Sequence, residues 1–258
     1  MTATTEELVL ERDGAVLVLR LNRPDARNAL TPGLIAQLGA AMITAEADPD
    51  VRAVVVTGSG DRAFCAGMDL RAFANGETIE AGDATAAYYR LLAGEITVPL
   101  VGAANGTAIG GGLELLLGCD VIVAAELAKF GFPEVRRGLF PAGGGTNLGR
   151  RVPLGVALEM TLTGDLVDAT RAYELGLVNA VTASHQVLAT ALEFAGRIAR
   201  NAPLGLAATK ELVRLGVTDP ARAGERGREW QRVVFASEDA REGAAAFVEK
   251  REPRWRGR

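Results

Sequence analysis

The sequence is poor in the residues that build metal sites and nucleophile sites. Among 258 residues it contains one histidine, His185, and two cysteines, Cys65 and Cys119. Two cysteines cannot form a disulfide framework, and one histidine nearly excludes a His/Cys metal site. A Ser-His-Asp or Cys-His nucleophile would have to use His185. That residue lies at a predicted helix start and is interpreted as a surface histidine, with a general base as the weak alternative.

Long apolar runs and an excess of positive charge are also missing. No run of eighteen apolar residues occurs, so we expect no transmembrane helix. The formal net charge is −4, which argues against nucleic acid as the main partner because phosphate binding needs a basic face. The first residues, MTATTEELVLERDG, lack the basic and apolar regions of a secretory signal. We therefore expect a cytoplasmic location.

What the sequence does contain is an ordinary globular composition with much glycine. Apolar residues make up 48% and charged residues 23%, which allows a sizeable core. The 31 glycines exceed the usual share of about 7%. Some part of the molecule must therefore expose its backbone or bring two backbones close together.

The first half of the chain alternates between strand and helix patterns. The patterns predict a hairpin (8–12 and 15–22), a helix (31–47), a buried strand (51–58), a helix (81–97), a buried strand (98–106), a helix (111–118) and a strand (119–125). Thr31 is the predicted N-cap of the helix over 31–47, with Pro32 at its first position. The β-α-β order predicts a largely parallel sheet with crossovers.

From about Gly149 onward the pattern is mainly helical. Helices are predicted over 153–162, 167–174, 186–200, 205–216 and 220–249, with one strand over 177–181. We expect a β/α core over 1–200 that carries the site, and a helical C-terminal region over 201–258. The apolar stripe of the last helix must cover something. The sequence leaves open whether it covers its own core or a neighbouring subunit.

Two glycine-rich stretches could bind a ligand. GSGDRA (58–63) follows a buried strand and matches the G-x-G-x-x-A dinucleotide pattern, but Phe64–Gly67 interrupts the helix that the pattern needs. A plain turn is the preferred interpretation. The triplet GGG (110–112) lies at a strand-to-helix junction, where free N–H groups could receive an oxyanion. Tight helix–strand packing is the alternative. AFCAGMDL (63–70) offers a second glycine before a helix start.

Two carboxylates accompany the glycine triplet. Glu114 lies among four leucines of the predicted helix, and Glu134 follows Phe132-Pro133 at a turn. Burial should raise the pKa of Glu114. The alternatives are an ion pair of Glu114 with Arg136 or Arg137, and a helix-start role for Glu134. Two carboxyls beside an oxyanion receptor suit proton transfer next to a thioester carbonyl.

These motifs, in this order, resemble the crotonase (enoyl-CoA hydratase/isomerase) superfamily over nearly the whole chain. The matching blocks are LNRPDARNAL (21–30), VVVTGSGDRAFCAGMDL (54–70), AANGTAIGGGLELLLGCDVIVA (103–124), KFGFPEVRRGLFPAGGGTNL (129–148), LTGDLVDATRAYELGLVNAV (162–181) and EGAAAFVEKREPRW (242–255). The resemblance implies an α/β fold of the ClpP-like spiral type, made of β-β-α units with a C-terminal helical trimerisation region. It also implies a trimer or a dimer of trimers, and an acyl-CoA substrate with no separate cofactor, because coenzyme A is part of the substrate.

The resemblance also assigns site residues. Glu114 and Glu134 match the glutamate pair of the hydratases, and the N–H groups of Met68 and Gly111 match the oxyanion hole. The implied residues of the substrate and coenzyme A path are Arg27, Ala66, Gly67, Asp69, Leu70, Phe132 and Ala142. We expect syn hydration of a trans-2-enoyl-CoA, with Glu114 as base and Glu134 as proton donor, although coupled carboxyls share protons.

The chain departs from the hydratase pattern at three positions, and other reactions stay open. Met68 stands where a small residue is usual, and Ala142 replaces the glycine of P-G-x-G-G-T. Phe132 either narrows the acyl channel or belongs to the core. The alternatives to hydration are double-bond isomerisation, hydration of a branched or ring acyl-CoA, and non-catalytic acyl-CoA binding. The presence of both glutamates argues against non-catalytic binding.

Overall fold

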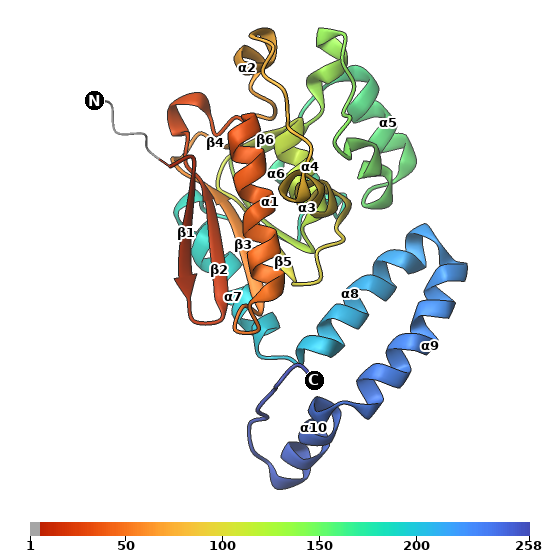
Figure 1. Cartoon of the computed structure of the whole chain (residues 1–258). Coiled ribbons are helices and arrows are strands. Elements are labelled where there is room, and N and C mark those ends of the chain that lie inside the picture. The colour runs from red at the N-terminus through yellow and green to blue at the C-terminus, as the bar shows by residue number, and fades with distance from the viewer. Residues whose placement is uncertain (1–5) are drawn as a thin grey trace.

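The computed structural model describes residues 6–258, which form a mixed α/β body followed by a helical arm (Figure 1). The strands are β1 (Leu8–Asp13), β2 (Val16–Leu21), β3 (Ala53–Gly58), β4 (Ala63–Cys65), β5 (Leu100–Ala104), β6 (Thr107–Ile109), β7 (Val121–Ala125), β8 (Lys129–Gly131), β9 (Val167–Asp168) and β10 (Ala180–Thr182). The α-helices are α1 (Pro32–Ala47), α2 (Leu70–Ala74), α3 (Asp83–Ala93), α4 (Gly111–Gly118), α5 (Leu154–Thr163), α6 (Ala169–Glu174), α7 (Val187–Ala199), α8 (Pro203–Thr218), α9 (Pro220–Ala236) and α10 (Glu238–Glu249). Short 3₁₀ helices are η1 (Pro24–Ala26), η2 (Pro133–Arg137), η3 (Gly145–Arg150) and η4 (Ser184–Gln186).

The larger sheet has six strands in the order β1-β2-β3-β5-β7-β10. Its first pair is antiparallel and every other pair is parallel, so the predicted, largely parallel sheet is confirmed. All six residues of β3 are buried, as its continuous run of apolar residues predicts for a strand covered on both faces.

A second sheet of four short strands, β4-β6-β8-β9, was not predicted. Its members have two or three residues each, which is too short for a period-2 pattern to be recognised. The turn after β3 leads into β4 rather than into a helix. The plain-turn interpretation of residues 58–63 is therefore confirmed, and dinucleotide binding there is wrong.

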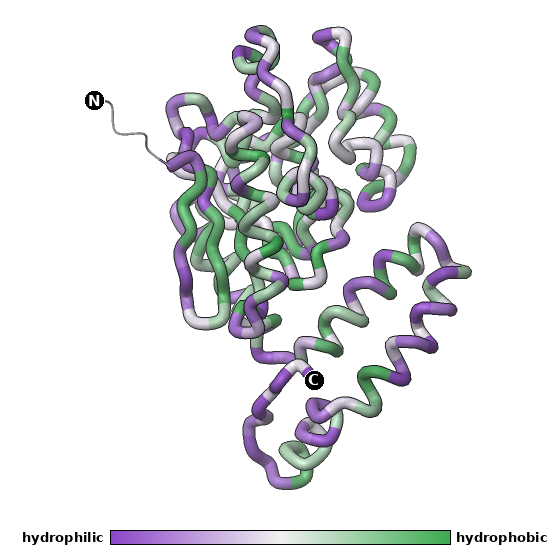
Figure 2. Tube along the Cα trace, in the orientation of Figure 1, coloured by the Kyte–Doolittle hydropathy of each residue, from purple (hydrophilic) through white to green (hydrophobic). Residues whose placement is uncertain are grey.

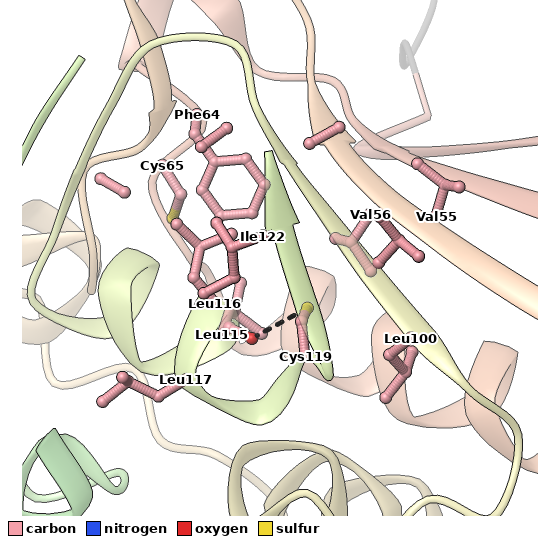
Figure 3. Close-up of a cluster of buried hydrophobic side chains, with 14 of the residues drawn as sticks. Val55, Val56, Phe64, Cys65, Leu100, Leu115, Leu116, Leu117, Cys119 and Ile122 are labelled. Atoms are coloured by element: carbon pink, nitrogen blue, oxygen red, sulfur yellow. Dashed lines mark hydrogen bonds between the residues drawn. The ribbon is translucent and has the colours of Figure 1, made fainter. Parts of the chain in front are cut away.

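Two helices of the body show how the sequence determines their ends. The Thr31 hydroxyl accepts the N–H of Leu34 at 3.0 Å and Pro32 opens α1, as predicted. In α4 every residue after Gly111 is buried. Its leucines belong to the main hydrophobic core, where Leu116 lies near Phe64 and Ile122 (Figure 3).

Some predicted boundaries are wrong. The helix expected over 81–97 ends at Ala93 because Gly94 adopts φ +74°, which terminates a helix. The strand expected over 177–181 forms over Ala180–Thr182, and the first two residues of the helix expected over 167–174 form β9. The single helix expected over 220–249 is two helices, because Ser237 is extended and its hydroxyl caps α10 by accepting the N–H of Ala240.

Helices α8, α9 and α10 form an arm that projects from the body (Figure 1). Within the described residues, the main hydrophobic core contains no residue after Ala199. Apolar residues are instead distributed along the helices of the arm (Figure 2). The largest exposed ones are Val213, Val217, Val233, Phe235, Phe247 and Val248. No helix within residues 6–258 is long and apolar enough to span a bilayer.

Candidate active site

The glycine triplet allows the first turn of α4 to pack closely against Glu134 and Cys65. Gly110 precedes the helix with φ +54° and ψ −130°, a conformation that favours glycine. A Cβ atom on Gly110 would lie 2.8 Å from Oε1 of Glu134, and one on Gly112 would overlap the carbonyl oxygen of Cys65. Tight packing therefore explains Gly112, while Gly110 leaves room for a carboxyl.

Two backbone N–H groups, those of Met68 and Gly111, lie close together at this turn. Gly67 has φ +83°, and a Cβ atom there would lie 3.0 Å from the nitrogen of Gly111. The neighbouring segment pairs with Leu30, whose N–H donates to Gly67 and whose carbonyl accepts from Asp69. Within residues 6–258 the N–H groups of Met68 and Gly111 have no acceptor. They are the two amides that the resemblance assigned to an oxyanion hole.

Glu114 lies in the first turn of α4 and is 6% exposed. Its Oε1 accepts the N–H of Gly145 at 2.9 Å. Burial raises the pKa of Glu114, and the charge of Glu134 raises it further, while N–H groups of Gly145 and Gly143 oppose both effects. The carboxyl is therefore held in place with a proton affinity above that of an exposed glutamate.

Glu134 lies in η2, across from the same turn. Its Oε1 faces Gly110, and its Oε2 is buried without a hydrogen-bond partner within the described residues. Burial raises the pKa of Glu134, and its own N–H and the charge of Arg137 oppose the rise. A buried oxygen without a partner is costly when charged. It can be satisfied by a proton or by a bound molecule.

The ion-pair alternative for Glu114 is wrong. Arg136 pairs with Asp165 and donates to the carbonyl of Thr163. Arg137 donates to the carbonyl of Pro133 at 3.4 Å. Neither arginine contacts Glu114, so the buried carboxyl is satisfied by backbone N–H groups instead of a cation.

The raised pKa of Glu114 predicts a stability effect. A carboxyl whose pKa is higher in the folded state destabilises the fold at pH values above that pKa, and the cost disappears as pH falls to the unfolded value, 4.5. We expect Glu114→Gln to raise the melting temperature at pH 7, with the gap to wild type narrowing toward pH 4.5. Calorimetry across this range checks the result. A gap that widens on acidification would contradict the raised pKa.

The remaining predicted site residues fall into two groups. Met68, Leu70, Arg27 and Ala142 are exposed, and Ala66 is partly exposed with its N–H on the carbonyl of Arg27. Ala142 does not have positive φ, so the departure from glycine causes no backbone strain there.

Asp69 and Phe132 have structural roles. The Asp69 carboxylate caps α2 and pairs with Arg23 at 2.9 Å. Phe132 is 0% exposed and packs against Gly145. Of the two alternatives for Phe132, its place in the core is confirmed, and its assignment to the substrate path stays a prediction.

The loop that holds Glu114 was not predicted from the sequence. A Cβ atom on Gly143 would overlap Glu114, Gly144 has φ +126°, and Gly145 donates the hydrogen bond. The three consecutive glycines of PAGGGT were the available signal.

The sequence also contains two cysteines and one histidine, the residue types that most often serve as nucleophile and general base. Burial raises the pKa of both Cys65 and Cys119 to about 12, so neither is a thiolate near neutral pH. His185 is exposed in η4. No cluster of His, Cys, Asp or Glu within residues 6–258 could hold a metal ion.

Known proteins are similar to this chain in sequence and fold. The profile of the enoyl-CoA hydratase/isomerase family matches residues 11–258. A carnitinyl-CoA dehydratase from Salmonella enteritidis is 37% identical over 98% of this chain and 100% of its own. The crystal structure of an enoyl-CoA hydratase from Mycobacterium tuberculosis has a TM-score of 0.89 and 39% identity, covering 98% of this chain and 99% of that chain. A carnitinyl-CoA hydratase from Mycobacterium avium has a TM-score of 0.77 and 40% identity, covering 99% of this chain and 100% of that chain.

The family profile covers almost the whole chain, and the relatives align from end to end with the α/β body and the helical arm. The chain belongs to the enoyl-CoA hydratase/isomerase (crotonase) family.

Proposed function

We propose that this protein catalyses the reversible syn addition of water to a trans-2-enoyl-CoA. One observation supports the proposal: the buried carboxyl of Glu114 and the partly buried carboxyl of Glu134 border the same helix turn, beside two N–H groups without acceptors in the described residues. The N–H groups suit a thioester oxygen that gains negative charge. The carboxyls suit proton transfer at the two adjacent carbons.

In the proposed mechanism the N–H groups of Met68 and Gly111 bind the thioester oxygen and draw electrons from the double bond. One carboxylate takes a proton from water as its oxygen attacks Cβ. The other carboxyl delivers a proton to Cα, so that one water is added in total. Dehydration follows the same path in reverse. The similar proteins include one named as a dehydratase and one named as a hydratase.

The hydrogen bonds support Glu114 as base and Glu134 as acid. N–H groups donated to Glu114 stabilise its charged form. The buried Oε2 of Glu134 has no donor within the described residues, which favours the protonated form. Because the two carboxyls interact, the apparent pKa values of a pH–rate profile will belong to the pair.

The test is a substrate panel with mass detection. Crotonyl-CoA, longer enoyl-CoAs and carnitinyl-CoA, the compound that the Salmonella relative's name contains, are incubated with the protein. Gain of one water, or its loss from carnitinyl-CoA, supports the proposal. A product of unchanged mass with a moved double bond would indicate an isomerase. Tight binding without turnover on any substrate would indicate a binding protein.

We further propose that the exposed apolar side chains of the arm pack against other copies of the chain. Phe235 and Phe247 are 77% and 85% exposed, and Val248 adjoins the latter. Large apolar groups so exposed are typical of surfaces that another molecule covers. A trimer or a dimer of trimers is the assembly that the resemblance implies.

Charging this surface should break the assembly. We expect the double variant Phe247→Asp/Val248→Asp to shift the particle mass from an oligomer to the monomer in analytical ultracentrifugation, because each carboxylate would be desolvated in the interface. Glu225→Ala, at an exposed polar position of α9, is the control and should keep the oligomer. An unchanged mass in the double variant would refute the assignment of this surface.

A further inference from the structure

Helix α4 connects the candidate site to the helical arm. It has eight residues, so its two ends lie only about 12 Å apart at 1.5 Å per residue. The first turn carries the Gly111 N–H and Glu114. The last turn ends at Gly118, followed directly by Cys119 and Asp120.

Two guanidinium groups hold the carbonyl end of α4. Arg151 of the body donates to the carbonyls of Leu117, at 3.1 Å, and of Cys119. Arg214 of α8 donates to the carbonyls of Gly118 at 3.0 Å and Cys119 at 3.3 Å. These carbonyls have no hydrogen-bond partner inside the helix. The positive charges of the two arginines interact favourably with the negative, C-terminal end of the helix dipole.

Asp120 fixes the arm to the same point. Its carboxylate pairs with Arg214 at 2.9 Å and with Lys210 at 2.8 Å, and it also accepts the N–H of Leu100 in β5 at 2.8 Å. Burial lowers the pKa of Lys210, while Asp120 opposes this effect. The arm is thus joined to the end of α4 and to the central sheet through one carboxylate.

The fit around Arg214 is close. A Cβ atom on Gly94, which has φ +74°, would overlap the guanidinium group. The guanidinium therefore occupies a space that only a glycine leaves open. Its planar fork contacts two carbonyls and one carboxylate at once, which a lysine ammonium cannot reproduce in the same geometry.

We infer that Arg214 is a positioning residue: from the arm, it holds the carbonyl end of α4 and so fixes the Gly111 N–H and the Glu114 carboxyl at the other end. This inference rests on the proposed function. A short helix packed on all sides moves as one body, so release at Gly118 allows a shift at Gly111. Misplacement of catalytic groups by about 1 Å can cost up to roughly 10²-fold in rate.

The experiment compares Arg214→Ala and Arg214→Lys with wild type. We expect Arg214→Ala to lower kcat by about tenfold, within the range for misplaced groups, with a much smaller change in KM. Arg214→Lys should recover part of the loss. Arg226→Ala is the matched control, because Arg226 binds Glu211 of α8 at 3.1 Å and does not contact α4. Melting temperature and particle mass are measured for every variant.

A second readout reports the oxyanion site without turnover. A cinnamoyl-CoA carrying a para-dialkylamino group absorbs at longer wavelength when its carbonyl is polarised. We expect a red shift on binding to wild type and a smaller shift with Arg214→Ala at saturating protein. The acid limb of kcat should also move to higher pH in this variant, because Glu114 would lose part of its bond from the Gly145 N–H.

The outcomes separate the two proposals. If wild type hydrates no enoyl-CoA and gives no red shift, the proposed function fails. If wild type is active and Arg214→Ala matches it in kcat, spectral shift and pH profile, the role of Arg214 alone is refuted. An equal loss in Arg226→Ala, or a loss explained by unfolded or dissociated protein, would also refute it.

Discussion

Glu134→Gln is expected to lower kcat by roughly 10²–10⁴-fold, the range that general acid–base catalysis contributes. Glutamine preserves the size of the side chain but cannot deliver a proton to Cα. The N–H groups of Met68 and Gly111 stay in place, so KM should change little. Steady-state kinetics with an enoyl-CoA that wild type hydrates measures the effect.

Glu114→Gln should give a loss of similar size, and the double variant should be little slower than either single one. Residues that act as a unit in one step are not additive. The control is Glu126→Gln, at an exposed position of the turn after β7, which should keep wild-type kcat. Near-wild-type activity in either single variant at Glu114 or Glu134, with intact folding, would sink the two-carboxyl mechanism.

Gly111→Pro is expected to lower kcat/KM by about 10²–10³-fold, the loss found when one oxyanion donor is removed. Gly111 is the first residue of α4 and does not have positive φ. Proline is well tolerated at this helix position, where the N–H has no partner within the helix. The substitution therefore deletes one hydrogen-bond donor with little damage to the helix.

Gly111→Ala is the matched variant, because it keeps the N–H and adds the same Cβ atom. That atom would lie 3.1 Å from Cδ1 of Leu30 and 3.6 Å from the nitrogen of Met68, so a small shift of one leucine accommodates it. Alanine should retain far more activity than proline. Equal activities in the two variants would show that the Gly111 N–H does not bind the thioester oxygen.

Local sequence patterns predicted the parts of the fold that have a continuous apolar run or a clear helix start. The buried run of β3, the Thr31 cap and the glycine start of α4 were all readable because each is a short-range effect. The four-stranded sheet was not, since strands of two or three residues carry no pattern of their own and form only through tertiary pairing.

The candidate site, too, could be predicted from the sequence only in part. The resemblance singled out Glu114 and Glu134, yet their hydrogen-bond partners depend on a loop whose path the sequence does not reveal. The Gly143–Gly145 segment wraps the Glu114 carboxyl, and Phe132 packs behind it. Whether Phe132 faces a channel or the core depends on how η2 sits against η3, and only the three-dimensional arrangement decides that.

Because both native thiols are buried, a cysteine introduced into the arm can be labelled selectively. Since Cys65 and Cys119 are buried and remain protonated near neutral pH, maleimide reagents should leave the native fold unlabelled. A cysteine introduced at an exposed arm position would then be the sole reactive thiol. A fluorophore attached there would report how the arm moves when acyl-CoA binds.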